Sequence, residues 1–155
     1  GDVTVNNSAQ FQANTVNMSA ARNATLNSAV IRGFTTLNVS AIQNMTVASG
    51  SFTGASASPT ITSSFSAGDT LIVNNSSFAN VADISLSART VNLSNIDFPN
   101  GSTVKLYSQN GLLADKPNTG AASVPGHVNF ILNVNYNGNP AQLFVGGNIN
   151  IGVRP

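Results

Sequence analysis

The chain lacks cysteine, tryptophan and glutamate altogether. Without cysteine there is no disulfide, no thiolate chemistry and no cysteine-based zinc site. Charged residues make up only 7% of the 155 residues and the net charge is +1, so the chain offers no basic surface for nucleic acid. No apolar run approaches the roughly 18 residues that a membrane-spanning helix requires. We therefore expect neither a nucleic-acid partner nor a membrane span.

Asparagine, serine and threonine stand where charges are normally found, and the 23 asparagines outnumber all charged residues together. An uncharged surface of this kind is typical of a secreted or cell-surface protein, so we expect an extracellular location. The sequence begins at Gly1 rather than at Met, as a processed mature protein or a fragment does.

The most informative feature is a repeat. A threonine followed by an apolar residue recurs at Thr4, Thr25, Thr46, Thr70 and Thr90. A second series of strand-like starts runs through Thr15, Thr36, Thr60, Asp83 and Thr103. A phenylalanine closes the first strand-length segment of each unit, at Phe11, Phe34, Phe52, Phe78 and Phe98. A period of about 20–24 residues predicts a solenoid whose units bury their apolar faces against one another.

Within the units, apolar and polar residues alternate with period two. In TVNLSNIDF (90–98), Val91 and Leu93 share one face, while the intervening residues are polar. The unit is too long for the 18-residue coil of a left-handed hexapeptide helix. We therefore predict an all-β fold, a right-handed parallel β-helix of about five rungs over residues 1–110. The unit at 46–69 contains Pro59 and is expected to form a rung with a bulging loop.

The repeat pattern ends at Gly111, and residues 111–155 are predicted to form a loop followed by a β extension. The stretch 112–126 contains two prolines and is interpreted as a long loop. Residues 127–136 then alternate as a strand, and strand-like runs follow at 141–145 and 148–153. This strand-rich tail either caps the last rung or reaches a neighbouring molecule.

Catalytic and metal-binding patterns are scarce. His127 is the only histidine, and a triad with Ser123 and Asp115 lacks the GxSxG nucleophile turn. No calcium-loop motif is present, which leaves at most a weak site at Asp69 or Asp97. We expect no enzyme activity, no metal and no cofactor.

Nine Asn-X-Ser/Thr triplets are possible glycan acceptors in a secretory host. They begin at Asn6, Asn17, Asn23, Asn38, Asn44, Asn74, Asn75, Asn92 and Asn100. A chain this rich in Asn, Ser and Thr also forms such triplets by chance, and the asparagines then serve in turns and side-chain ladders. We favour this second interpretation.

The exposed ends of the expected solenoid are its most suggestive feature, because each end is a sheet edge with unpaired main-chain groups. The repeat starts at about residue 3, and Gly1-Asp2 is too short to cover the first rung. We expect head-to-tail pairing with other copies, or else a fragment of a longer solenoid. The apolar residues expected at the contact are Val3, Val5, Phe11, Val128, Phe130, Leu132, Val134 and Tyr136.

The expected function is therefore structural: an extracellular subunit that assembles with itself into a filament or a surface layer. The alternative is an adhesin or glycan-binding module of a larger surface protein. Such a module would bind surface polysaccharide through exposed asparagines and Tyr107 along one flank.

Two stretches carry a resemblance: TVNLSNIDFPNGSTVKLYSQNGLLADKPNTGAASVPGHVNFILNVNYNGNPAQ (90–142) and NINIGVRP (148–155). They resemble a segment near the C-terminus of large, mostly uncharacterised secreted bacterial proteins with haemagglutinin-like β-helical bodies. The resemblance covers about two-fifths of the chain. It implies an extracellular, repeat-rich surface protein and identifies no catalytic residue. The chain is short, whereas these relatives are long.

Overall fold

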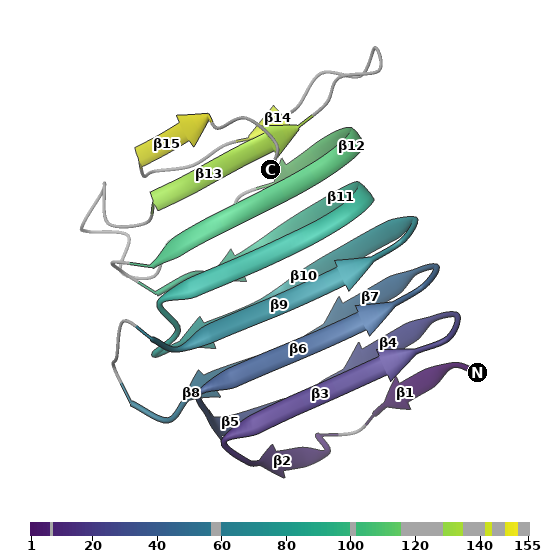
Figure 1. Cartoon of the computed structure of the whole chain (residues 1–155), viewed down its shortest axis with the longest axis vertical. Coiled ribbons are helices and arrows are strands. Elements are labelled where there is room, and N and C mark those ends of the chain that lie inside the picture. Colours follow the sequence, from purple (N-terminus) through teal and green to yellow (C-terminus); the bar gives the residue numbers. More distant parts are fainter. Residues whose placement is uncertain are drawn as a thin grey trace.

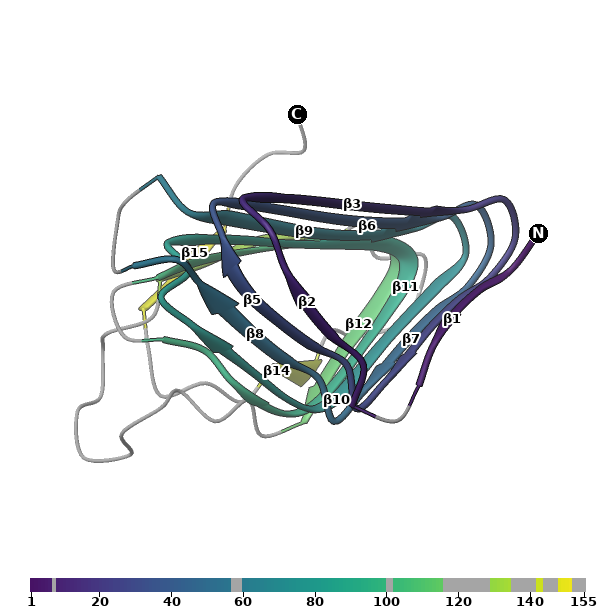
Figure 2. The same ribbon diagram turned by 90° about the horizontal axis from the view of Figure 1, so that it is seen from below.

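The computed structural model describes residues 1–6, 8–56, 60–99, 102–115, 129–134, 142–143 and 148–151, with side chains as far as Tyr107. All regular structure in these residues is strand, and every strand pair is parallel. The strands coil into a stack of about five turns with a three-sided cross-section (Figures 1 and 2). The predicted parallel β-helix of about five rungs is confirmed, and its right-handedness stays a prediction.

Each turn contributes one strand, or part of one, to each of three faces. The first face contains β1 (Val3–Val5), β4 (Ala24–Asn27), β7 (Met45–Ala48), the start of β10 (Thr70–Ala79), the end of β11 (Asp83–Asp97), the end of β12 (Thr103–Asp115) and β14 (Gln142–Leu143). The second face contains β2 (Gln10–Gln12), β5 (Val30–Phe34), β8 (Ser51–Gly54), the end of β10 and the last residues of β11, Ile96 and Asp97. The third face contains β3 (Thr15–Ala20), β6 (Thr36–Ala41), β9 (Thr62–Ala67), the starts of β11 and β12, β13 (Asn129–Val134) and β15 (Asn148–Ile151).

Alternation along the strands places every second side chain in the core, as period-two geometry requires. Val91 and Leu93, predicted to face inward, are buried. The largest buried side chains are phenylalanines, and four of them pack together. The ring centroids of Phe52 lie 5.1 Å from those of both Phe65 and Phe78, and Phe78 stacks on Phe98 at 5.8 Å. An aromatic column therefore runs through the third, fourth and fifth turns.

The predicted threonine columns are correct only in part. Thr4, Thr25 and Thr46 do lie in register, but Thr46 pairs with Ile72 and not with Thr70. The offset between paired residues rises there from 21 (46 − 25) to 26 (72 − 46). The third turn is thus five residues longer than the second.

The other two predicted columns need the same kind of correction. In the second series, Thr36 pairs with Thr62 and not with Thr60. In the phenylalanine series, Phe34 pairs with Gly54, and Ile31 fills the column between Phe11 and Phe52. The extra residues of the third turn lie between Gly54 and Thr62, where Pro59 predicted a loop; residues 57–59 themselves lie outside the described part.

The strand structure extends beyond the predicted break at Gly111. Gly111 to Asp115 continue β12 and pair with residues 90–94, so the first residues of the expected loop 112–126 are strand. The expectation failed there because the register shifts by one residue between Ala88 and Thr90, which interrupts the spacing of the repeat. β13 pairs in parallel with β12 and continues the third face.

A left-handed backbone conformation recurs at the corner between the first and second faces. The φ angles are 60° at Ser8, 56° at Ser28, 54° at Ser49, 47° at Asn75 and 50° at Asn95. A residue with a Cβ atom is strained at positive φ, whereas short polar residues tolerate it best. The recurring Ser and Asn therefore bend the chain at the same place in each turn.

Replacing Ser28 by valine is expected to lower the free energy of unfolding by about 1–2 kcal/mol, because a β-branched residue fits positive φ poorly. Ser28→Gly should cost nothing or stabilise, since glycine adopts this conformation freely. Ser85→Val, in the extended strand β11, is the matched control. Urea unfolding measures all three, and equal losses in the two valine variants would contradict the role of the corner.

Candidate functional site

The first turn has an open sheet edge. In the described part of the chain, β1, β2 and β3 each pair on one side only, with β4, β5 and β6. The N–H of Thr35 donates to the carbonyl oxygen of Asn14 (2.7 Å), and the N–H of Ile42 donates to that of Ala20 (3.2 Å). Main-chain groups alternate in direction along a strand, so those of Asn17 and the odd-numbered residues on either side of it point away from the second turn. Among the described residues these groups have no strand beside them, and main-chain groups of this kind pair readily with another strand.

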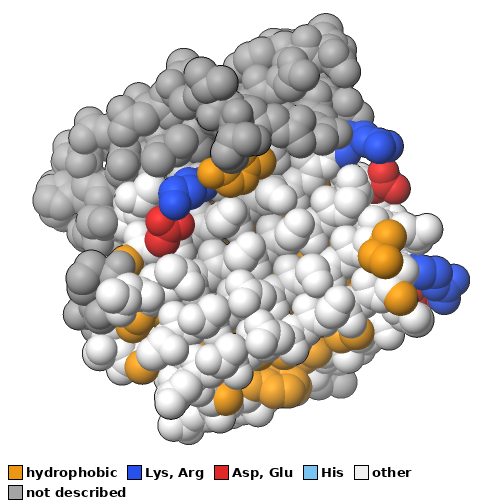
Figure 3. Space-filling view, in the orientation of Figure 1, with side chains coloured by type: hydrophobic (Ala, Val, Ile, Leu, Met, Phe, Trp, Pro, Cys, Tyr) orange, Lys and Arg blue, Asp and Glu red, His pale blue; other side chains and the backbone are white. Residues whose placement is uncertain are grey.

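Apolar side chains line this edge. Phe11 is 38% exposed, and Val3 and Met18 are half-buried against the core. Figure 3 shows hydrophobic side chains gathered along the lower rim, over the first-turn strands, while the third face above them is almost entirely uncharged and polar. Of the predicted contact residues, Phe11 and Val3 lie on this rim. Val5 is buried and belongs to the core.

Three of the predicted contact residues of the tail, Phe130, Leu132 and Val134, lie on β13. β13 has strands on both sides, because Phe130 pairs with Val104 and Ile149, and Leu132 pairs with Leu106 and Ile151. The last described strand of the third face is therefore β15, which pairs with β13 alone in the described residues. Val134 pairs with Ser108, and Val128, Tyr136, His127 and Ser123 lie outside the described residues.

Asparagine side chains form hydrogen-bonded ladders between turns, as the composition indicated. The Nδ2 of Asn38 donates to the Oδ1 of Asn17 at 2.9 Å, that of Asn44 to Asn23 at 3.2 Å, and that of Asn95 to Asn75 at 2.8 Å. Glycosylation stays a prediction. Five of the nine triplets begin at ladder residues, which supports the structural interpretation; Asn100 lies outside the described part.

The ladder at the corner between the third and first faces ends in a carboxylate. Both the N–H and the Nδ2 of Asn23 donate to the Oδ1 of Asp2, at 3.1 Å and 3.4 Å. The backbone N–H of Asn23 and, after it, the charge of Arg22 hold the pKa of Asp2 below its ordinary value. A hydrogen-bond acceptor thus stands at the open edge.

Two further ion pairs connect neighbouring turns. Asp69 lies 3.0 Å from Arg89 and Asp83 lies 2.7 Å from Lys105, in each case on the turn above. The Asp69–Arg89 pair is exposed and the Asp83–Lys105 pair is half-buried; pairs at the surface contribute little stability. Residues 1–6, 8–56, 60–99 and the other described segments hold no cluster of three potential metal ligands. Nor do they include a helix long and apolar enough to span a membrane.

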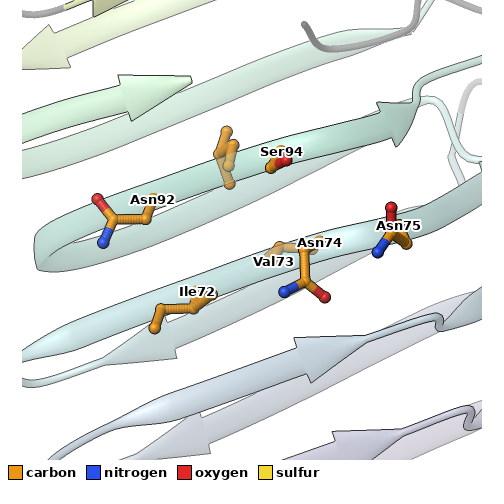
Figure 4. Close-up of a pocket in the computed structure, with 7 residues that line it drawn as sticks. Ile72, Val73, Asn74, Asn75, Asn92 and Ser94 are labelled. Atoms are coloured by element: carbon orange, nitrogen blue, oxygen red, sulfur yellow. The ribbon is translucent and has the colours of Figure 1, made fainter. Parts of the chain in front are cut away.

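A hollow of about 320 Å³ with a mixed polar and apolar lining opens between β10 and β11. It is lined by Ile72, Val73, Asn74, Asn75, Asn92, Leu93 and Ser94 (Figure 4). The two strands contribute residues that are 20 apart in sequence and in direct register, since Ile72 pairs with Asn92 and Asn74 with Ser94. The sequence does not reveal this hollow, because its residues are ordinary strand positions with no motif.

Comparison with family models, with curated proteins and with solved structures gives no match for this chain. The fold, the open edge of the first turn and the hollow between β10 and β11 are therefore inferred from the structure of this chain alone. The resemblance of residues 90–155 to secreted bacterial repeat proteins stays a prediction.

Proposed function

We propose that the chain is a structural extracellular subunit that assembles end to end with copies of itself into a filament or surface layer. The observation that carries the proposal is the open edge of β1, β2 and β3, with its unpaired main-chain groups and its apolar rim. An edge of this kind is a template for another strand. Its occupant in the proposal is the last turn of a second copy.

The geometry of the stack supports this partner. All strands are parallel and successive turns repeat the same path, so a second copy continues the pattern if its β14 and β15 lie under the first turn. The spacing between turns would remain about 4.8 Å across the junction. Contact between two different ends does not close on itself, so it produces an open filament.

The composition supports the same assembly. With a net charge of +1, little repulsion opposes the stacking of many copies. Burial of Phe11 and its neighbours on the rim would add a hydrophobic contribution, at about 25 cal/mol for each Å² of apolar surface removed from water. The uncharged, Asn-rich surface and the resemblance of residues 90–155 favour an extracellular or cell-surface location.

The substitution Asn17→Pro tests the proposal. Proline removes an N–H that points toward the open edge, and an edge strand tolerates it. We expect this variant to stay monomeric at concentrations at least about tenfold above those at which the wild type assembles, measured by light scattering and sedimentation. Asn17→Ala is the matched control: it loses the hydrogen bond to Asn38 but keeps the main-chain donor, so it should assemble normally.

A second variant covers the case in which Asn17→Pro fails to fold. Phe11→Lys places a charge on the rim, where burial against another copy is costly, and Phe11→Leu keeps the rim apolar. Only the lysine variant should lose assembly. A monodisperse wild type at high concentration, or normal assembly of both Asn17→Pro and Phe11→Lys, would show that this edge is not the contact.

A further inference from the structure

The hollow on the first face has the chemistry of a ligand site that is separate from the open edge. Asn92 lies directly opposite Ile72 and Ser94 opposite Asn74. Four side chains therefore stand at the corners of a rectangle of about 4.8 Å by 6.6 Å. Figure 4 shows Asn92 and Ser94 on one strand, and Ile72, Asn74 and Asn75 on its neighbour.

The amides of the hollow are available for a ligand. In the described part of the chain no hydrogen bond engages the side chain of Asn74 or Asn92, whereas Asn17 and Asn38 are bonded to each other. Each carboxamide offers two donors and an acceptor, and the hydroxyl of Ser94 offers both functions. The hollow can thus satisfy a ligand that both donates and accepts hydrogen bonds at several points.

The lining also indicates the charge of the ligand. None of the seven lining residues is ionisable, so the side chains that the structure describes at the hollow offer no charged partner to an anion or a cation. Ile72, Val73 and Leu93 line the hollow beside the polar groups and make more than half of its lining apolar. A neutral sugar ring matches this combination, since it has hydroxyls around its rim and C–H groups on its faces.

A peptide is a poorer match for the same place. A peptide strand binds to a sheet through free main-chain groups. β10 pairs with β7 on one side and with β11 on the other, so the main chain at the hollow is already paired. Recognition there must come from side chains.

Tyr107, the one glycan contact that the sequence predicts by residue number, lies on another face. Tyr107 and the asparagines of β3 and β6 are on the third face, where Asn17 and Asn38 are engaged in their ladder. We infer that the hollow, and not that flank, binds one ring of a neutral polysaccharide through Asn74, Asn92 and Ser94. A volume of about 320 Å³ is at the lower end of the range of small-molecule sites, which suits a single ring.

Isothermal titration calorimetry with three neutral hexasaccharides, cellohexaose, mannohexaose and galactohexaose, tests the inference. A tetragalacturonate serves as the charged comparison. We expect at least one neutral hexasaccharide to bind with a Kd on the order of 1 mM, because one ring makes few contacts. The tetragalacturonate should bind more weakly.

Variants locate the site. Asn92→Leu should weaken binding at least about tenfold, equivalent to about 1.4 kcal/mol, while Asn38→Leu on the third face should leave it unchanged. Asn92→Ser, which keeps a small polar residue, gives a second measurement should the leucine variant fold poorly, and it too should bind more weakly.

Three results would each overturn the inference: absence of heat with all three neutral sugars at about 10 mM, unchanged binding in both Asn92 variants, or tighter binding of the tetragalacturonate. Assembly of the chain is measured in separate experiments, so the result on sugar binding does not depend on whether the chain forms a filament.

Discussion

Replacing Phe52 by alanine is expected to lower the free energy of unfolding by about 3–5 kcal/mol. Phe52 is fully buried and its ring centroid lies 5.1 Å from those of Phe65 and Phe78. Truncation removes its hydrophobic contribution, leaves a cavity in the aromatic column and ends two ring–ring contacts. Because the third turn joins the first two turns to the fourth and fifth, the loss should affect the cooperativity of the whole stack.

Urea unfolding followed by far-ultraviolet circular dichroism measures the effect. The matched control is Phe11→Ala, which truncates the same side chain on the exposed rim, where about 1 kcal/mol or less should be lost because the ring is only partly buried. Measured on monomeric protein, similar losses in the two variants would contradict the assignment of Phe52 to the core and Phe11 to the surface.

The second large effect is expected at Gly68, directly after β9. Its N–H donates to the carbonyl oxygen of Ala41 at 3.1 Å, and a Cβ atom at this position would overlap the carbonyl oxygen of Ile42 on the turn below. Gly68→Ala therefore forces the third turn away from the second at this corner. We expect a loss of about 1–3 kcal/mol, as for overpacking of a tight contact.

The control for this substitution is Gly1→Ala, since nothing lies within 4 Å of a Cβ atom at Gly1. Thermal unfolding of the two variants and the wild type measures the difference. If Gly68→Ala unfolds at the wild-type temperature, the two turns are not packed as closely at this corner as described.

The architecture was predictable from the sequence because a solenoid repeats both its pattern and its chemistry. The paired threonines Thr4, Thr25 and Thr46 are 21 residues apart and lie in register, since each occupies the same outward position of its turn. Inward positions such as Val91 and Leu93 alternate with polar residues, so strand direction and burial could both be inferred.

The register of the third turn could not be inferred, for a physical reason. Ser63 is an inward residue, only 2% exposed, and it stands in register with Leu37 and Ile84. A polar residue at a buried position conceals the apolar alternation, so the sequence pattern starts this strand at Thr60-Ile61; Ile61 is itself buried, but β9 begins at Thr62. The hydroxyl of Ser63 has no partner in the described structure, which shows how unusual this position is.

The two candidate sites also differ in how far the sequence predicts them. An open edge follows from any solenoid, so the first-turn rim was foreseen, although Val5 proved to be a core residue. The hollow forms where Asn92 and Ser94 stand beside Ile72 and Asn74 of the neighbouring turn. The repeat itself gives the offset of 20 residues between Thr70 and Thr90, and so places Asn92 beside Ile72, but no motif marks these outward positions as a hollow.

The central claim, that copies pair through the edge of the first turn, is tested most directly by electron cryomicroscopy of the purified chain at high concentration. The expected result is a filament whose strands lie across its axis, with the turn-to-turn spacing of about 4.8 Å uninterrupted from one subunit to the next. Isolated single particles, or filaments in which β1, β2 and β3 stay unpaired while the side faces make the contact, would contradict it.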